Sequence, residues 1–201
     1  MSRRRVEVRR EEILRATVDE VTERGFSSTR VADVAHRLGI STGLVFYHFE
    51  SKEALLSQAF AYAAERDLER LDAAAQGNGS AVRRLAKILA YYGPEESAAG
   101  WPLWIDAWAT ALRIPELAEV SQQLDVRWKD AVAMVIADGV ARGEMTCADP
   151  TAAAWRITAL LDGLAVQATV HTGVLTRRQV TSWVRNAAAA ELGIDPATLR
   201  R

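Results

Sequence analysis

The chain has 201 residues, of which 49% are hydrophobic and 25% are charged, and its formal net charge at pH 7 is −1. This composition excludes a disordered or fibrous chain and predicts a globular protein that can bury a core in one or two domains. Cys147 is the single cysteine, which excludes an intrachain disulfide and favours a reducing compartment, so we expect a cytoplasmic protein.

Positive charge is concentrated at the amino end. Residues 1–52 contain 10 Lys and Arg against 8 Asp and Glu, and the first ten residues contain five arginines and one glutamate. Such a segment is either a solvated tail or an arm that reaches a DNA backbone or minor groove. Because a candidate DNA reader follows, we expect Arg3, Arg4 and Arg5 to form a DNA-binding arm.

The next elements predict a helix-turn-helix. A first helix is expected from about residue 7 to 24, followed by a short helix capped by Thr29, with apolar residues at Val31, Val34, Ala35 and Leu38. Gly39 can adopt the left-handed backbone that ends this helix. Ser41 can cap the following helix, with Val45 and Phe49 pointing inward and Thr42, Gly43 and Leu44 in its exposed first turn.

These residues carry a family resemblance. The segment from Gly39 to Leu56, GISTGLVFYHFESKEALL, resembles the signature of the TetR family of bacterial transcriptional regulators. The resemblance implies that base edges are contacted by Thr42, Gly43 and Leu44, and phosphates by Thr29, Tyr47, His48 and Lys52. Short side chains allow a helix to lie deep in a major groove, and Arg30 and Arg37 are expected to add charge.

The rest of the chain predicts a series of helices, so we expect an all-α fold. Helical spacing and end signals predict helices over about 52–75, 80–92, 100–113, 115–143, 150–172 and 177 onward, the last with a capping box at Thr176 and Gln179. Residues 1–52 are expected to form the helix-turn-helix DNA-binding domain. Residues 53–201 are expected to form a larger domain for effector binding and dimerisation.

Apolar surface in the last two long helices exceeds what one small bundle needs. A helix that is apolar on two faces can cover its own core and a partner copy, which predicts a twofold homodimer, as the resemblance also implies. The expected interface residues are Trp155, Leu160, Leu164, Val180, Trp183, Val184 and Ala187. The alternative is that these helices fill a monomeric core.

Trp101, Trp104 and Trp108 share one face of a predicted helix, so they either belong to the core or line an effector pocket. A pocket would favour a small aromatic, apolar or cationic effector, the last through cation–π attraction, with Asp106 or Asp162 supplying negative charge. The remaining candidate lining residues are Tyr91, Tyr92, Trp128, Gln167 and His171.

The sequence indicates a ligand-released repressor that binds double-stranded operator DNA. An alternative is an architectural or activator protein of the same fold without small-molecule control. An enzyme is not expected, because no nucleophile elbow, metalloprotease motif or phosphate-cradling loop occurs. No metal or cofactor is expected, since His36, His48 and His171 lie far apart. No membrane partner is expected either, since Arg156, Asp162 and Gln167 interrupt the most apolar stretch.

Overall fold

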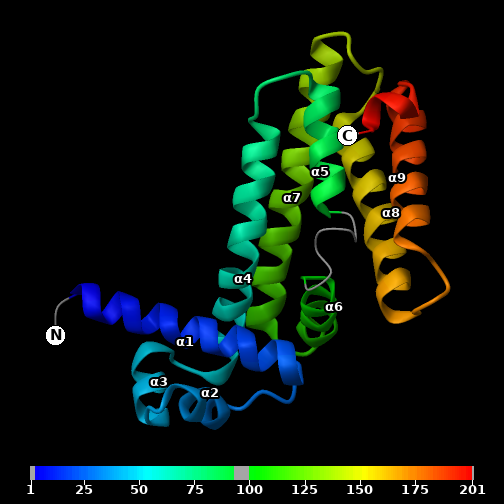
Figure 1. Cartoon of the computed structure of the whole chain (residues 1–201). Helices are drawn as coiled ribbons and strands as arrows, with labels where there is room; N and C mark the ends of the chain where they lie inside the picture. The colour runs from blue at the N-terminus through cyan, green and yellow to red at the C-terminus, as the bar shows by residue number, and fades with distance from the viewer. Residues whose placement is uncertain (1–2, 93–99, 201) are drawn as a thin grey trace. The chain divides into compact units, whose positions relative to one another are not determined.

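A computed structural model describes residues 3–92 and 100–200, with side chains from residue 6 to 91 and from 100 to 200 (Figure 1). All elements in these ranges are helical: α1 (Arg3–Arg24), α2 (Val31–Leu38), α3 (Thr42–His48), α4 (Lys52–Ala75), α5 (Ala81–Tyr92), α6 (Gly100–Ala111), α7 (Pro115–Ala141), α8 (Pro150–Val170), α9 (Arg177–Leu192) and the short 3₁₀ helix η1 (Pro196–Leu199). The predicted all-α fold is therefore confirmed.

The chain divides into two compact units. Unit 1 comprises residues 1–67 and 102–124, and unit 2 comprises residues 68–101 and 125–201. Unit 1 contains α1, α2, α3, the first part of α4, most of α6 and the start of α7. Unit 2 contains the remainder. This geometric division and the expected functional domains, 1–52 and 53–201, describe different properties of the chain, and the functional division stays a prediction.

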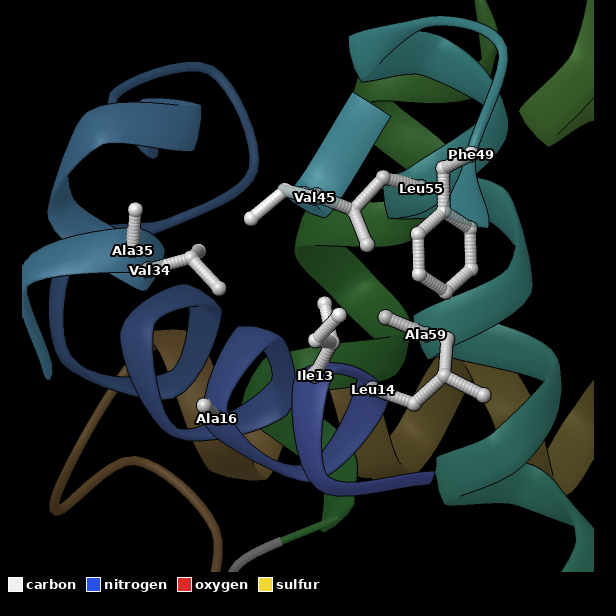
Figure 2. Packing of buried hydrophobic residues seen from close by; sticks show 9 residues of the cluster. All are labelled: Ile13, Leu14, Ala16, Val34, Ala35, Val45, Phe49, Leu55 and Ala59. Carbon is white, nitrogen blue, oxygen red and sulfur yellow. The ribbon is translucent and has the colours of Figure 1, made fainter. Parts of the chain in front are cut away.

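Helices α1, α2 and α3 and the start of α4 form the amino-terminal part of unit 1, here called the head. One apolar cluster holds the head together (Figure 2). Its members are the residues that helical periodicity places on the inner faces of α1, α2, α3 and α4: Ile13, Leu14, Ala16, Val34, Ala35, Val45, Phe49, Leu55 and Ala59. Val45 and Val34 have no exposed surface. Full burial of side chains of this size stabilises the fold by about 1.5–3 kcal/mol each, before the entropy cost of ordering them.

The turn between α2 and α3 follows from one glycine. Gly39 adopts φ 64°, and its N–H and that of Ile40 donate to the carbonyls of His36 and Ala35. These two hydrogen bonds satisfy carbonyls that the end of a helix otherwise leaves unpaired. Ser41 then caps α3, because its Oγ accepts from the N–H of Leu44 at 3.2 Å. Residues 39–41 therefore determine the turn between α2 and α3.

One predicted cap is wrong. The residue that precedes α2 is Arg30, which makes no side-chain capping bond, whereas the hydroxyl of Thr29 donates back to the carbonyl of Gly25 at 2.8 Å. Thr29 therefore completes the end of α1 instead of the start of α2. The hydroxyl of Thr29 forms this bond because the carbonyl of Gly25 lies within hydrogen-bonding distance.

Unit 2 is built on α5, α8, α9 and the later parts of α4 and α7. Helices α8 and α9 lie side by side (Figure 1), and η1 packs on α5 and α9. Asp149 caps α8 by accepting from the N–H of Ala152, and the predicted capping box of α9, Thr176 with Gln179, is present. These local signals set where the two helices begin and so which faces they bury.

Candidate nucleic-acid interface

Helix α3 has one buried side and one open side. Val45 is fully buried and the following Phe49 is 2% exposed, so both anchor the helix to the head. The opposite side carries Thr42, Gly43 and Tyr47, all exposed. A methyl group built at Gly43 would contact only the Oγ of Ser41, at 3.8 Å. The backbone at Gly43 is therefore uncovered, and it can approach the floor of a major groove.

The expected phosphate contacts occupy different environments. Tyr47 is 69% exposed, Arg30 is exposed and Lys52, the first residue of α4, is half-buried. Thr29 is 1% exposed, with its hydroxyl already donated to Gly25. Leu44, expected at a base edge, is half-buried. The residues with accessible polar groups or charge are thus Tyr47, Arg30 and Lys52.

His48 lies half-buried at the end of α3. Its ring meets that of Tyr47 edge-on, with centroids 5.2 Å apart. Burial lowers the pKa of His48, and the positive charges of Arg10 and Arg9 lower it further. In the free protein the imidazole is therefore held in its neutral form more strongly than an ordinary histidine.

Arg37, which the sequence suggests as additional positive charge, is already neutralised. Its guanidinium donates to Oε1 of Glu20 at 2.7 Å and to Oε2 of Glu23 at 2.6 Å. The hydrogen bonds that Arg37 donates to Glu23 and to Glu20 raise its pKa, that to Glu23 having the larger effect. Arg37 therefore braces α2 against α1 and contributes little net charge to the surface.

The candidate DNA-binding residues chosen from the sequence did not include Phe46 or Arg10. Phe46 is 48% exposed on α3 beside Tyr47, a position that the helical spacing from buried Val45 could have revealed. Arg10 lies on α1, with its guanidinium 5.1 Å from the centroid of the Phe49 ring. No local pattern signals that contact, because 39 positions separate the two residues.

The arginines expected to form an arm begin α1, which starts at Arg3 instead of the predicted residue 7. The backbone of this segment is helical. The side chains of Arg3, Arg4 and Arg5 lie outside the described residues, as does that of Tyr92 in the candidate effector pocket.

The candidate effector residues divide between the two units. Trp104 and Trp108 belong to unit 1, where their ring centroids are 5.9 Å apart and Trp104 meets Phe60 of α4 at 4.8 Å. Trp101 and Trp128, 5% and 6% exposed, belong to unit 2.

The other candidates in unit 2 are Tyr91 and Asp162, both half-buried, and Gln167 and His171, both exposed at the end of α8. Asp106 belongs to unit 1, and its carboxylate accepts the backbone N–H of Phe26 at 2.7 Å, so it is engaged within the head.

The residues expected at a subunit interface also divide by burial. Val180 and Val184 are buried within the single chain, at 0% and 2% exposure, so they stabilise unit 2 itself. Leu164 and Ala187 are half-buried. Of the expected interface residues, three large apolar ones remain open to solvent: Trp155 at 48%, Leu160 at 38% and Trp183 at 45%.

Comparison with known proteins identifies the family from two regions. Residues 13–59 match the family model of bacterial regulatory proteins of the tetR family, and residues 81–193 match the carboxyl-terminal domain of the BetI-type transcriptional repressor. The chain belongs to the TetR family of bacterial transcriptional regulators. The resemblance seen in the helix-turn-helix sequence is thereby confirmed. Since members of this family are regulators, the prediction that the chain is not an enzyme is confirmed too.

Individual relatives extend along nearly the whole of this TetR-family chain. The HTH-type transcriptional regulator BetI of Escherichia coli K12 is 26% identical over 194 residues, which cover 94% of this chain and 96% of that protein. A transcriptional regulator from Saccharomonospora viridis, crystallised with choline, is 23% identical and superposes with a TM-score of 0.82 over 92% of this chain and 98% of its own.

A third relative binds a different molecule. The transcriptional regulator FadR of Bacillus subtilis, in complex with stearoyl-CoA, is 17% identical and superposes with a TM-score of 0.70 over 90% of this chain and 98% of its own. One fold thus serves two unlike ligands in these relatives. The effector of a given chain therefore depends on its own lining residues.

Within the described part of the TetR-family chain, no helix is both long and apolar enough to cross a membrane.

Proposed function

We propose that this TetR-family regulator is a homodimeric repressor that binds a palindromic operator. One observation carries the proposal: α3 buries Val45 and Phe49 against the head and presents Thr42, Gly43 and Tyr47 outward. Gly43 allows close approach to base edges, and the Tyr47 hydroxyl can donate to a phosphate oxygen. Arg30, before α3 in the sequence, and Lys52, after it, add positive charge near α3, the proposed recognition helix.

Two copies would be joined through α8 and α9. The solvent-exposed Trp155, Leu160 and Trp183 offer an apolar surface that a second copy can cover. A twofold dimer places two reading helices in successive major grooves, about 34 Å apart, which is why its operator would be palindromic. Operator binding would take place in the cytoplasm.

For the effector we propose a small quaternary ammonium compound, bound within residues 53–201. Choline is bound by the Saccharomonospora viridis relative, and the carboxyl-terminal domain of this chain is of the BetI type. Unit 2 supplies the appropriate groups, namely the indoles of Trp101 and Trp128, the ring of Tyr91 and the carboxylate of Asp162. Aromatic faces and a carboxylate attract a cation that cannot donate hydrogen bonds.

Release from DNA would follow from a shift between two conformations. An effector changes operator affinity only if it binds the non-operator conformation more tightly than the operator conformation. Each tenfold preference contributes about 1.4 kcal/mol, so a few cation–π contacts suffice to displace most of the protein from DNA.

The test uses the purified full-length protein and a labelled duplex from its own promoter region. Fluorescence anisotropy should show specific binding, and choline should reverse it. Ethanolamine, which lacks the three methyl groups, is the matched control and should act far more weakly. Specific binding that no quaternary ammonium compound alters would support the alternative of a DNA-binding protein without this control. No specific binding to any promoter fragment would refute the proposal.

A further inference from the structure

The arginines of unit 1 differ in whether a carboxylate neutralises them. Four of them form ion pairs with glutamates of α1: Arg9 with Glu12, Arg15 with Glu11, Arg24 with Glu20, and Arg37 with both Glu20 and Glu23. An arginine with a carboxylate partner has little net charge to offer a DNA phosphate, because binding would require that ion pair to be broken or shared.

Arg10 is held in a different way. Its guanidinium lies over the ring of Phe49 at 5.1 Å and donates to Oε1 of Gln58 on α4. Both partners are uncharged. Among the residues that the structure describes, no carboxylate forms an ion pair with Arg10, and its side chain is exposed. The side chain is therefore fixed in position while its charge stays uncompensated.

These contacts place the charge at the carboxyl end of the reading helix. Phe49 is the residue that ends α3, directly after His48. Burial lowers the pKa of His48, and the positive charge of Arg10 lowers it further, with a smaller contribution from Arg9, so Arg10 lies close enough to act on this ring. A positive field at this corner would attract an anion next to Tyr47 and His48, where the DNA backbone is expected to run.

We propose that Arg10 is a phosphate-binding residue that, together with His48, holds the DNA backbone at the carboxyl end of α3. This inference rests on the proposed function, since the phosphate belongs to operator DNA. The planar guanidinium can donate two parallel hydrogen bonds to a phosphate, and its contacts with Phe49 and Gln58 reduce the entropy lost on binding. Arg10 thus connects α1 directly to the bound DNA.

The salt dependence of operator binding tests this role. Each phosphate that a protein neutralises contributes about 0.9 to the slope of the logarithm of affinity against the logarithm of salt concentration. Arg10→Met removes the charge and the hydrogen-bond donors and keeps an unbranched apolar side chain. We expect it to lower operator affinity about tenfold per half-site, the size of one charge-assisted hydrogen bond, and, because the proposed homodimer carries two copies of Arg10, to reduce the slope on the full operator by about 1.8, or about 0.9 for each phosphate. Arg15→Met is the matched control on the same helix, and it should leave the slope unchanged.

A second variant keeps Arg10 and cancels its charge. Gln58→Glu is nearly isosteric and would give Arg10 the carboxylate partner that the other arginines have. The fold should be retained, since an exposed hydrogen bond is replaced by an exposed ion pair. Operator affinity and the salt slope should nevertheless fall as in Arg10→Met. The new carboxylate also repels DNA by itself, so the double variant is measured too: for a merely structural Arg10 the effects of Gln58→Glu and Arg10→Met on affinity and slope would add, whereas for a phosphate-binding Arg10 the double variant should be little worse than Arg10→Met alone.

The outcomes separate the two proposals. If wild-type protein binds no duplex specifically, the proposed function is refuted. If it binds specifically but Arg10→Met, folded by circular dichroism, retains the wild-type slope, only the phosphate role of Arg10 is wrong. Should Arg10→Met not fold, Arg10→Gln takes its place in both measurements. Wild-type binding that 10 mM inorganic phosphate abolishes at constant ionic strength would indicate a site for free phosphate and overturn the assignment to the DNA backbone.

Discussion

His48 is a single residue at which DNA binding and protonation should be coupled. Its pKa lies below the ordinary value because of burial and of Arg10 and Arg9, the charged groups of α1 that act on it, while its ring neighbours are Tyr47 and Phe49. A nearby DNA phosphate would favour the protonated ring, so the complex would bind a proton that the free protein lacks. We expect operator affinity to rise as the pH falls from about 8 to about 6.

The rise should level off below the pKa of His48 in the free protein, because both states are then protonated. His48→Asn should remove most of this pH dependence. His36, an exposed histidine of α2, provides the control, and His36→Asn should preserve it. Dissociation constants measured across this pH range at fixed salt decide the matter, and a wild-type pH profile in His48→Asn would contradict the coupling.

Residue roles were predictable from sequence where they depend on neighbours in the chain. Ser41, Gly39 and the pair Thr176 and Gln179 act as predicted, since caps and left-handed turns involve residues a few positions apart. Thr29 was assigned to the start of α2 because its hydroxyl can accept an amide N–H there. The same hydroxyl can also donate to a carbonyl, and in the structure it donates to that of Gly25. The placement of Arg10 over Phe49 could not be predicted, because helical periodicity carries no information about which helices cross.

At the scale of elements, α6 is joined to the connection between α1 and α2. The carboxylate of Asp106 accepts the N–H of Phe26, and the Phe26 ring meets that of Phe60 edge-on, with centroids 5.9 Å apart. Phe60 in turn meets Trp104 of α6 at 4.8 Å. The tryptophan-rich helix therefore supports the head directly, in addition to any role that its tryptophans have toward an effector.

This junction makes Gly25 sensitive to substitution. Gly25 has φ 82°, and a methyl group added there would lie 3.0 Å from Oδ2 of Asp106. Since that oxygen is held by Phe26, it cannot move away without weakening a hydrogen bond. We expect Gly25→Ala to lower the free energy of unfolding by about 2–3 kcal/mol, from left-handed strain and the lost hydrogen bond together. Urea denaturation followed by tryptophan fluorescence measures it.

Gly39→Ala separates the two contributions. Gly39 has φ 64° and nothing within 4 Å of an added methyl group, so this control should show the conformational cost alone. Asp106→Ala should itself lower the free energy of unfolding by about 1–3 kcal/mol, because it leaves the N–H of Phe26 without its acceptor. In that background Gly25→Ala should cost no more than Gly39→Ala. Strict additivity of the two substitutions would show that they do not interact.

At the scale of the whole molecule, the sequence predicted the helices and the family but not which apolar residues stay exposed on the single chain. The periodicity of α8 and α9 shows apolar residues on more than one face, and only packing reveals which face covers the protomer's own core. Val180 and Val184 proved to be internal, whereas Trp155 and Trp183 remain about half exposed. The effector residues were hard to assign for the same reason, since an aromatic stripe at helical spacing fits a core or a pocket equally well.

Trp155 has the properties expected of a residue in the proposed dimer interface. The ammonium of Lys129, on α7 of unit 2, lies 4.6 Å from the centroid of the Trp155 ring and is paired with Asp125, yet 48% of Trp155 is exposed. A fixed, half-exposed indole loses little conformational entropy when a partner covers it. Such residues contribute disproportionately to association.

We therefore expect Trp183→Glu, alone or with Trp155→Glu, to dissociate the dimer, because a subunit interface would have to bury the new carboxylates without partners. Sedimentation equilibrium should show a shift from twice the chain mass of 22.1 kDa to the monomer mass at micromolar concentrations. Leu112→Glu is the control, since Leu112 is 83% exposed but lies outside α8 and α9. The monomeric variant should still fold and should bind a full palindrome no more tightly than a half-site, because one reading helix engages one groove. A wild-type dimer constant in both tryptophan variants would place the subunit interface elsewhere on the chain.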